Sequence, residues 1–220
     1  MNLVDRIVLV SILVTLGAQI IYRRSFWFFS YPLKKSDGFV SFSKFLKIIW
    51  TLSVLIIFGI LFYWSYLQYS FWQGSEMTRY LLPPYQSISY FISYVGVRFF
   101  GPWFLALLAS FLISGAVRFL NKKFEERFFE DEEIRLIALG IFLTGYPGFI
   151  FYLVSILVVG VLLSTFYFLL SKGRMPFYYF WMPMAIFAMI MKIWLLSIFH
   201  LTSFWSQFAL GDFYKLIFGF

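Results

Sequence analysis

The chain has 220 residues, of which 62% are hydrophobic, 25% are aromatic and only 13% are charged. A soluble domain is about half apolar and about one-quarter charged, so this composition excludes an ordinary soluble protein and predicts an all-α membrane protein. The net charge of +8 does not indicate a nucleic-acid partner. The basic residues gather in loops beside apolar segments, as the positive-inside rule describes for membrane proteins.

The first apolar segment predicts a transmembrane helix over residues 4–22 that the protein retains. Tyr22, Arg23 and Arg24 follow it in place of the small residues of a signal-peptide cleavage site. After a basic loop, a second spanning helix is expected over residues 45–69. It ends in aromatic side chains typical of the headgroup level of a membrane, namely Tyr63, Trp64, Tyr66, Tyr69, Phe71 and Trp72.

The third span is expected over residues 103–120. The aromatic segment 88–100, which contains Arg98, is interpreted as lying along the membrane interface before Gly101 and Pro102 begin the span. Small residues at four-residue intervals on this helix favour close contact with another helix; they are Ala106, Ser110 and Ser114.

Residues 134–170 are too long for one ordinary span, and Gly145-Tyr146-Pro147-Gly148 interrupts them. Glycine and proline together are strong helix breakers, so we predict a short helix over 134–146 and a full helix over 149–170. A reversal and a kink at this break both fit the sequence. The last span is expected over 176–200, and the aromatic tail 201–220 is expected to lie at the interface.

Lysine and arginine counts predict the orientation of the chain. The basic residues of the first loop and of the region 118–135 lie on one side of the membrane, and Lys172 and Arg174 join them if the break is a reversal. This arrangement gives a polytopic helical bundle of about six spans in a single domain, residues 1–220. The N-terminus is then outside and the basic loops face the cytoplasm, as expected in the inner membrane of a prokaryote. A five-span arrangement would place Lys172 and Arg174 outside.

The scarcity of reactive side chains limits the chemistry that the chain can perform. It has no cysteine and one histidine, His200, which excludes disulfides, thiolate nucleophiles, iron–sulfur clusters and multi-histidine metal sites. Carboxylates alone can bind Mg²⁺ or Ca²⁺, but no loop carries them at fixed ligand spacing, so we expect no cofactor and no metal. Asparagine occurs only at Asn2 and Asn121, and this scarcity is typical of thermophile proteins.

Two groups of charged residues are candidates for function. The loop 121–133 is the only highly charged segment, and its acidic residues form either a solvated helix surface or a docking surface for a basic partner; they are Glu125, Glu126, Glu130, Asp131 and Glu132. Catalysis by Asp131 and Glu133 is a further alternative. Lys192 lies well inside the last span, where a charge suggests a functional site unless the side chain reaches outward to the headgroups.

Several short sequences follow one another in the order seen in a known family. They are Glu133-Ile134-Arg135-Leu136, Ile137-Ala138-Leu139-Gly140, Gly145-Tyr146-Pro147-Gly148, Gly160, and Gly173-Arg174-Met175-Pro176-Phe177. Over residues 104–190 the chain resembles the catalytic half of the type IV prepilin peptidases, which are intramembrane aspartic proteases with a Gly-x-Gly-Asp motif. The resemblance implies a second catalytic aspartate at Glu133 and a first one near Gln19 or Ile20.

The chain departs from that family at both catalytic positions. The second position holds glutamate and the first holds no acid; charged residues replace the motif glycines, and Tyr178-Tyr179 replaces a Gly-Pro. An aspartic protease needs two close carboxylates that share one proton. The resemblance therefore implies an inactive relative, unless Asp131 or Asp37 supplies the second carboxylate. Asp131 and Glu133 are two residues apart, so on a helix they point in different directions.

The sequence thus predicts a non-enzymatic polytopic subunit of a larger membrane assembly. Its expected partners are the lipid bilayer and other membrane protein subunits, which it contacts through helix faces and the acidic loop 121–133. One alternative is a prepilin-peptidase-like protease or its inactive relative. The other is a small transporter or channel that uses Lys192, although transporters usually have several polar groups at the membrane midplane.

Overall fold

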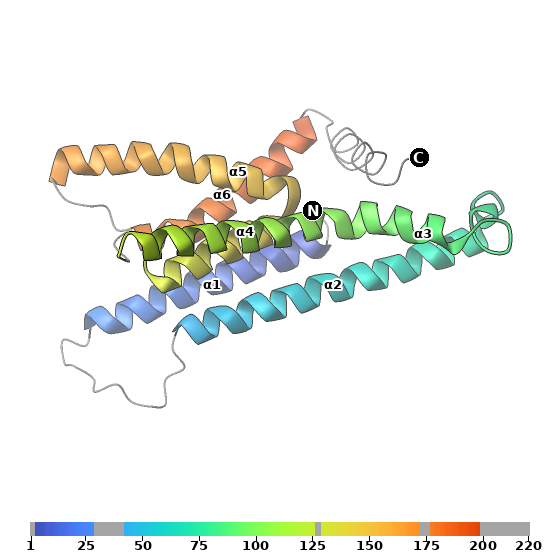
Figure 1. The fold of residues 1–220 in the computed structure, drawn as a ribbon, viewed down its shortest axis with the longest axis horizontal. Helices are drawn as coiled ribbons and strands as arrows, with labels where there is room; N and C mark the ends of the chain where they lie inside the picture. The colour runs from blue at the N-terminus through green and yellow to red at the C-terminus, as the bar shows by residue number, and fades with distance from the viewer. Residues whose placement is uncertain (1–2, 29–41, 126–128, 172–176, 199–220) are drawn as a thin grey trace.

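The computed structural model describes residues 3–28, 42–125, 129–171 and 177–198, which form a bundle of helices (Figure 1). No β-strand occurs within these ranges. The elements in chain order are α1 (Leu3–Phe28), α2 (Phe42–Gly74), the short turn η1 (Thr78–Leu81), α3 (Ile88–Val95), the π-helical turn η2 (Gly96–Phe100), α4 (Gly101–Lys123), α5 (Asp131–Ser171), the turn η3 (Phe177–Tyr179) and α6 (Trp181–Ile198).

Five helical segments within the described residues are long and apolar enough to cross a membrane. They are Leu3–Ile21, Phe42–Gly74, Ile88–Lys123, Asp131–Leu170 and Phe177–Trp194. A helix needs about 20 apolar residues to cross the hydrocarbon layer, and large apolar side chains are exposed along all five. The prediction of an all-helical, multi-pass membrane protein is confirmed at this level. The expected tail 201–220 lies outside the described residues.

The third apolar helix begins earlier than the sequence suggested. We expected a span over 103–120 that Gly101 and Pro102 would open, but α3, η2 and α4 form one continuous rod over 88–123. Pro102 is compatible with the rod because it follows the π-helical turn η2 closely, and local π-helical adjustments accommodate proline within membrane helices. The π-helical turn η2 joins the two α-helical parts.

Helix α5 reverses direction at its centre. Gly145 has a positive φ of 62° and Tyr146 has extended dihedral angles, so neither residue continues the helix. A side chain on Gly140 would place its Cβ atom 2.5 Å from the hydroxyl oxygen of Tyr152. In a straight helix these residues would lie about 18 Å apart along the axis. The break that the sequence left open is therefore a reversal, and Figure 1 shows the two halves diverging from it.

The first half of α5, residues 131–144, is the most deeply buried part of the bundle. Helices α1, α2, α4 and α6 all contact α5. Its buried side chains are Glu133, Ile134, Leu136, Ile137, Leu139, Ile141, Phe142, Leu143 and Thr144. This short helix therefore packs against protein on nearly every side. By contrast, the second half is partly exposed before Gly160 and exposed on nearly all sides after it.

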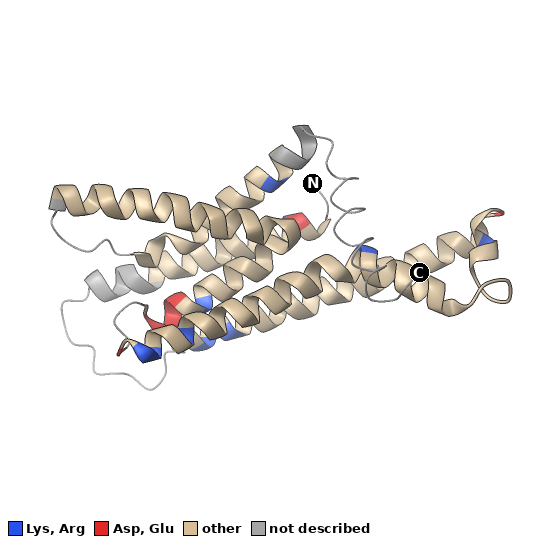
Figure 2. Cartoon of the chain, turned by 45° about the horizontal axis from the view of Figure 1, so that its top comes forward, with Lys and Arg blue, Asp and Glu red and all other residues tan. Residues whose placement is uncertain are grey.

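The two ends of the bundle differ in composition (Figure 2). One end, which we call the basic end, is where α2 begins and α4 ends; its exposed cations are Lys44, Lys47, Arg118, Lys122 and Lys123. The opposite end, which we call the aromatic end, contains the last turns of α2, η1 and α3. A smaller apolar cluster holds these elements together and consists of Trp72, Leu82, Phe91 and Val95.

Candidate functional site

Glu133 lies at the start of α5 at the basic end, and its carboxylate accepts hydrogen bonds from two N–H groups. The backbone N of Glu130 donates to Oε2 at 3.0 Å, and Nε1 of Trp181 donates to Oε1 at 3.4 Å. The side chain is only 7% exposed. A negative charge is favourable at a helix N-terminus, where backbone N–H groups lack partners in the helix. Glu133 therefore caps α5 and ties it to α6.

The other predicted acids lie on the surface around this cap. Asp131 is exposed whereas Glu133 is buried, so the two do not face a common site. Glu125 and Glu130 are also exposed and Glu132 is partly buried, while Glu126 and Asp37 lie outside the described residues. In the part of the chain that the structure describes, no three acidic or histidine side chains gather in an arrangement that could hold a metal ion.

Asn121 closes the acidic loop by binding both backbone polar groups of Phe129. Its Nδ2 donates to the carbonyl oxygen of Phe129 at 2.7 Å, and its Oδ1 accepts from the N of Phe129 at 3.0 Å. Asn121 is itself buried. The end of α4 and Phe129, two residues before α5, are thus joined directly, and the exposed acids lie on either side of this junction.

Gln19, the residue at the first family position, is fully buried in α1. Its Nε2 donates a hydrogen bond to the carbonyl oxygen of Tyr178. Because Glu133 binds Trp181, both positions that the resemblance singled out contact the segment 178–181 that leads into α6. An amide at Gln19 cannot ionise, so the pair does not supply the two carboxylates of an aspartic protease.

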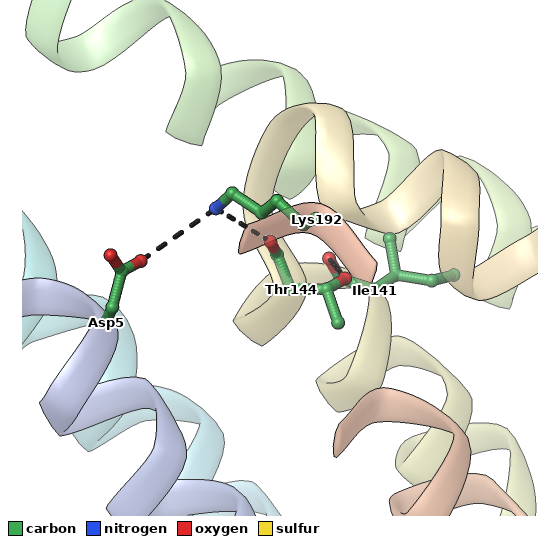
Figure 3. Close-up of polar contacts among 4 residues, drawn as sticks. All are labelled: Asp5, Ile141, Thr144 and Lys192. Carbon is green, nitrogen blue, oxygen red and sulfur yellow. Dashed lines mark hydrogen bonds and ion pairs between the residues drawn. The ribbon is translucent and has the colours of Figure 1, made fainter. Parts of the chain in front are cut away.

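Lys192 lies at the other end of the buried half-helix (Figure 3). Its Nζ donates to the carbonyl oxygen of Thr144 at 3.4 Å and lies 3.9 Å from Oδ1 of Asp5 in α1. The break after Thr144 removes the next helical turn, whose N–H groups would otherwise bind the last carbonyls of this helix. A positive charge is also favourable at a helix C-terminus. Lys192 therefore joins α1, α5 and α6.

Most of the Lys192 side chain is shielded from solvent, with 16% of it exposed and 23% of the Asp5 side chain exposed. Asp5 was missed by the sequence analysis. The signal was present, because a carboxylate within an apolar helix requires a partner. Nothing in the sequence, however, indicated that this partner is Lys192 in the last helix. His200, which follows α6, lies outside the described residues.

The small residues of α4 are used within the chain. Ala106 and Ser110 are buried, and the hydroxyl of Ser110 donates to the carbonyl oxygen of Ala138 in α5 at 2.8 Å. Ser114 instead donates to its own helix at the carbonyl of Phe111. The close helix contact that the spacing favoured is therefore the contact of α4 with the first half of α5.

Comparison with protein-family models, with curated proteins and with solved structures finds no match to this chain.

Proposed function

We propose that this chain is a non-enzymatic, polytopic subunit of a larger membrane assembly. The observation that carries the proposal is the surface of α5 between residues 161 and 170. Every residue there except Ser164 is exposed, and Leu162, Phe166 and Leu169 are each more than half exposed. A helix that is apolar on all sides is normally buried in protein or in lipid.

The length of the second half of α5 indicates that protein, rather than lipid alone, covers its apolar surface. At 1.5 Å per residue, residues 131–144 extend over ~21 Å and residues 147–171 over ~37 Å. The second half starts beside the end of the first half and is ~16 Å longer than it. Figure 1 shows its C-terminal end reaching past the ends of α4 and of the first half. We infer that a neighbouring subunit covers the apolar surface that extends beyond the bundle.

The proposed topology has six membrane segments, with the N-terminus outside. The basic end then faces the cytoplasm, the aromatic end faces outward, and the two halves of α5 form a hairpin that enters and leaves on the cytoplasmic side. The first half, at ~21 Å, is shorter than a hydrocarbon layer of about 30 Å, and its burial in protein makes this tolerable. The charge distribution suits the inner membrane of a prokaryote, and the low asparagine content suits a thermophile.

The state of the polar side chains supports a structural rather than a chemical role. Glu133, Ser110, Gln19 and Lys192 bind backbone or side-chain groups of the bundle itself. A transporter or an enzyme must present such groups to a substrate. The exposed acids beside α5 remain accessible, and we propose that they dock a basic segment of the partner.

Site-specific photo-crosslinking in membranes of the native host tests the subunit proposal. A photoreactive residue at Leu162 is compared with one at Leu55 in α2, because these leucines are 64% and 63% exposed. We expect a discrete protein adduct from position 162 and only lipid adducts from position 55. Lipid adducts alone at both positions would refute the proposed subunit contact.

An inactive relative of the prepilin peptidases is the second candidate, favoured by one observation. Gln19 and Glu133 contact the same short segment, residues 178–181, as two catalytic positions of one site would. The test is cleavage of a prepilin peptide by the wild type, by Glu133→Ala and by the double variant Gln19→Asp, Glu133→Asp. Activity in the double variant alone would support an inactive relative. If all three proteins leave the peptide intact, this candidate is discarded.

A further inference from the structure

Five exposed cations at the basic end have no partner in the described part of the chain. Lys44 and Lys47 lie in the first turns of α2, and Arg118, Lys122 and Lys123 lie in the last turns of α4. None of their side chains forms an ion pair or hydrogen bond within the described residues. Arg135 differs, since its Nη1 donates to the carbonyl oxygen of Ser43 at 3.2 Å.

Two aromatic contacts determine how α2 and α4 are aligned. The rings of Phe58 and Phe104 lie 5.2 Å apart, and those of Trp50 and Phe111 lie 5.3 Å apart. From the first contact to the second, the residue number falls in α2 and rises in α4, so the two helices are antiparallel. One to two turns beyond the second contact, Lys47 and Lys44 of α2 reach the same level as Gly115 and Arg118 of α4.

The surface between these cations is open at Gly115. Gly115 is exposed, and a Cβ atom added to it would meet no other atom within 4 Å. Lys44 and Lys47 lie on the exposed face of α2 with Ile48 and Leu52, since these positions follow the helical spacing of three and four residues. On α4, Phe111 and Arg118 are seven residues apart and share the face toward α2. Positive side chains thus border an exposed apolar surface.

We propose that this seam, formed by Lys44, Lys47, Gly115 and Arg118, binds the headgroup of an anionic phospholipid. The phosphate lies among the three cations, and the acyl chains lie along the apolar faces of α2 and α4 toward the aromatic end. Basic surfaces between helices beside a membrane boundary bind anionic headgroups by this combination of charge and apolar contact.

The proposal is tested on the full chain in micelles that contain phosphatidylglycerol and phosphatidylcholine in equal amounts, with bound lipid counted by native mass spectrometry. The triple variant K44Q/K47Q/R118Q is compared with R6Q/R79Q/R98Q. The control removes the same number of exposed cations, all of them outside the seam. Circular dichroism and size exclusion confirm that both variants are folded.

We expect the wild type to retain phosphatidylglycerol in preference to phosphatidylcholine. The seam variant should bind phosphatidylglycerol at least about tenfold more weakly, because each cation near an anionic headgroup contributes severalfold to the affinity. The control should change less than about twofold. The charge-preserving variant K44R/K47R should bind as the wild type does. Equal retention of the two lipids by the wild type, or equal losses in both triple variants, would overturn the proposal.

Discussion

Replacing Lys192 with methionine removes the positive charge at the end of the buried half-helix while keeping a flexible side chain of similar length. The Nζ atom lies 3.9 Å from Asp5 and 3.4 Å from the Thr144 carbonyl oxygen. Two unit charges 4 Å apart attract by about 4 kcal/mol at an effective dielectric constant of ~20. Loss of hydration offsets much of this attraction.

The net cost of Lys192→Met follows from these opposing contributions. Breaking a fully buried pair by removing one partner costs about 3–5 kcal/mol, and both partners here retain some exposure. Polar contacts between membrane helices contribute about 0.6 kcal/mol on average, because the unfolded helices also find partners in the membrane. We therefore expect the free energy of unfolding to fall by about 1–3 kcal/mol.

The assay is unfolding of the purified chain in mixed micelles by titration with a denaturing detergent. Lys47→Met, measured in micelles without anionic phospholipid, is the matched control, since Lys47 is exposed and has no ion pair within the described residues, and it should change the free energy by less than about 0.5 kcal/mol. The double variant Asp5→Asn, Lys192→Met should cost less than the sum of its single changes, because the two side chains are in contact. Equal stability of Lys192→Met and Lys47→Met would refute a structural role for Lys192. The transport alternative would then become the better explanation of this charge.

Two further predictions concern the other contacts of α5. Gly140→Ala should lower the free energy of unfolding by about 1–3 kcal/mol, because the added methyl group would overlap the rigid ring of Tyr152. Gly115→Ala is the control, since its Cβ position lies in open space, and it should leave the free energy of unfolding unchanged or raise it by up to about 1 kcal/mol. The same unfolding titration compares the two variants. Glu133→Ala should cost about 1–3 kcal/mol, since it leaves the buried N–H group of Trp181 without its acceptor. Slower proton exchange at that indole in the variant than in the wild type would contradict this reasoning.

The helices were predictable because their signal is local. Apolar runs longer than about 18 residues mark membrane helices whatever they pack against, and the Gly145–Gly148 break is equally visible in the sequence. The outcome of the break was not predictable. A reversal and a kink use the same residues, and the choice depends on whether Tyr152 can pack against Gly140 twelve positions earlier. That contact requires a glycine at a particular register, which hydropathy does not reveal.

The pairing of charges was also beyond the reach of a single sequence. Lys192 was identified as a candidate from its position in an apolar helix, but Asp5 is 187 positions away along the chain, and only the packing of α1 against α6 brings the two together. The start of the third membrane helix was misplaced for a related reason. Gly101 and Pro102 are helix breakers by composition, yet they follow the π-helical turn η2, and such a turn accommodates proline within a membrane helix.

The buried half-helix of α5 has a negative charge at its beginning and a positive charge at its end. Glu133 binds the N-terminal side and Lys192 the C-terminal side, which is the arrangement that complements the helix dipole. A helix of ~21 Å is too short to cross the hydrocarbon layer, so its two ends cannot both lie in water. The terminal backbone groups of the end inside the membrane must therefore find partners inside the protein. The two residues that looked most like functional sites meet this need, which is why we look for function on the exposed surfaces of α5, α2 and α4.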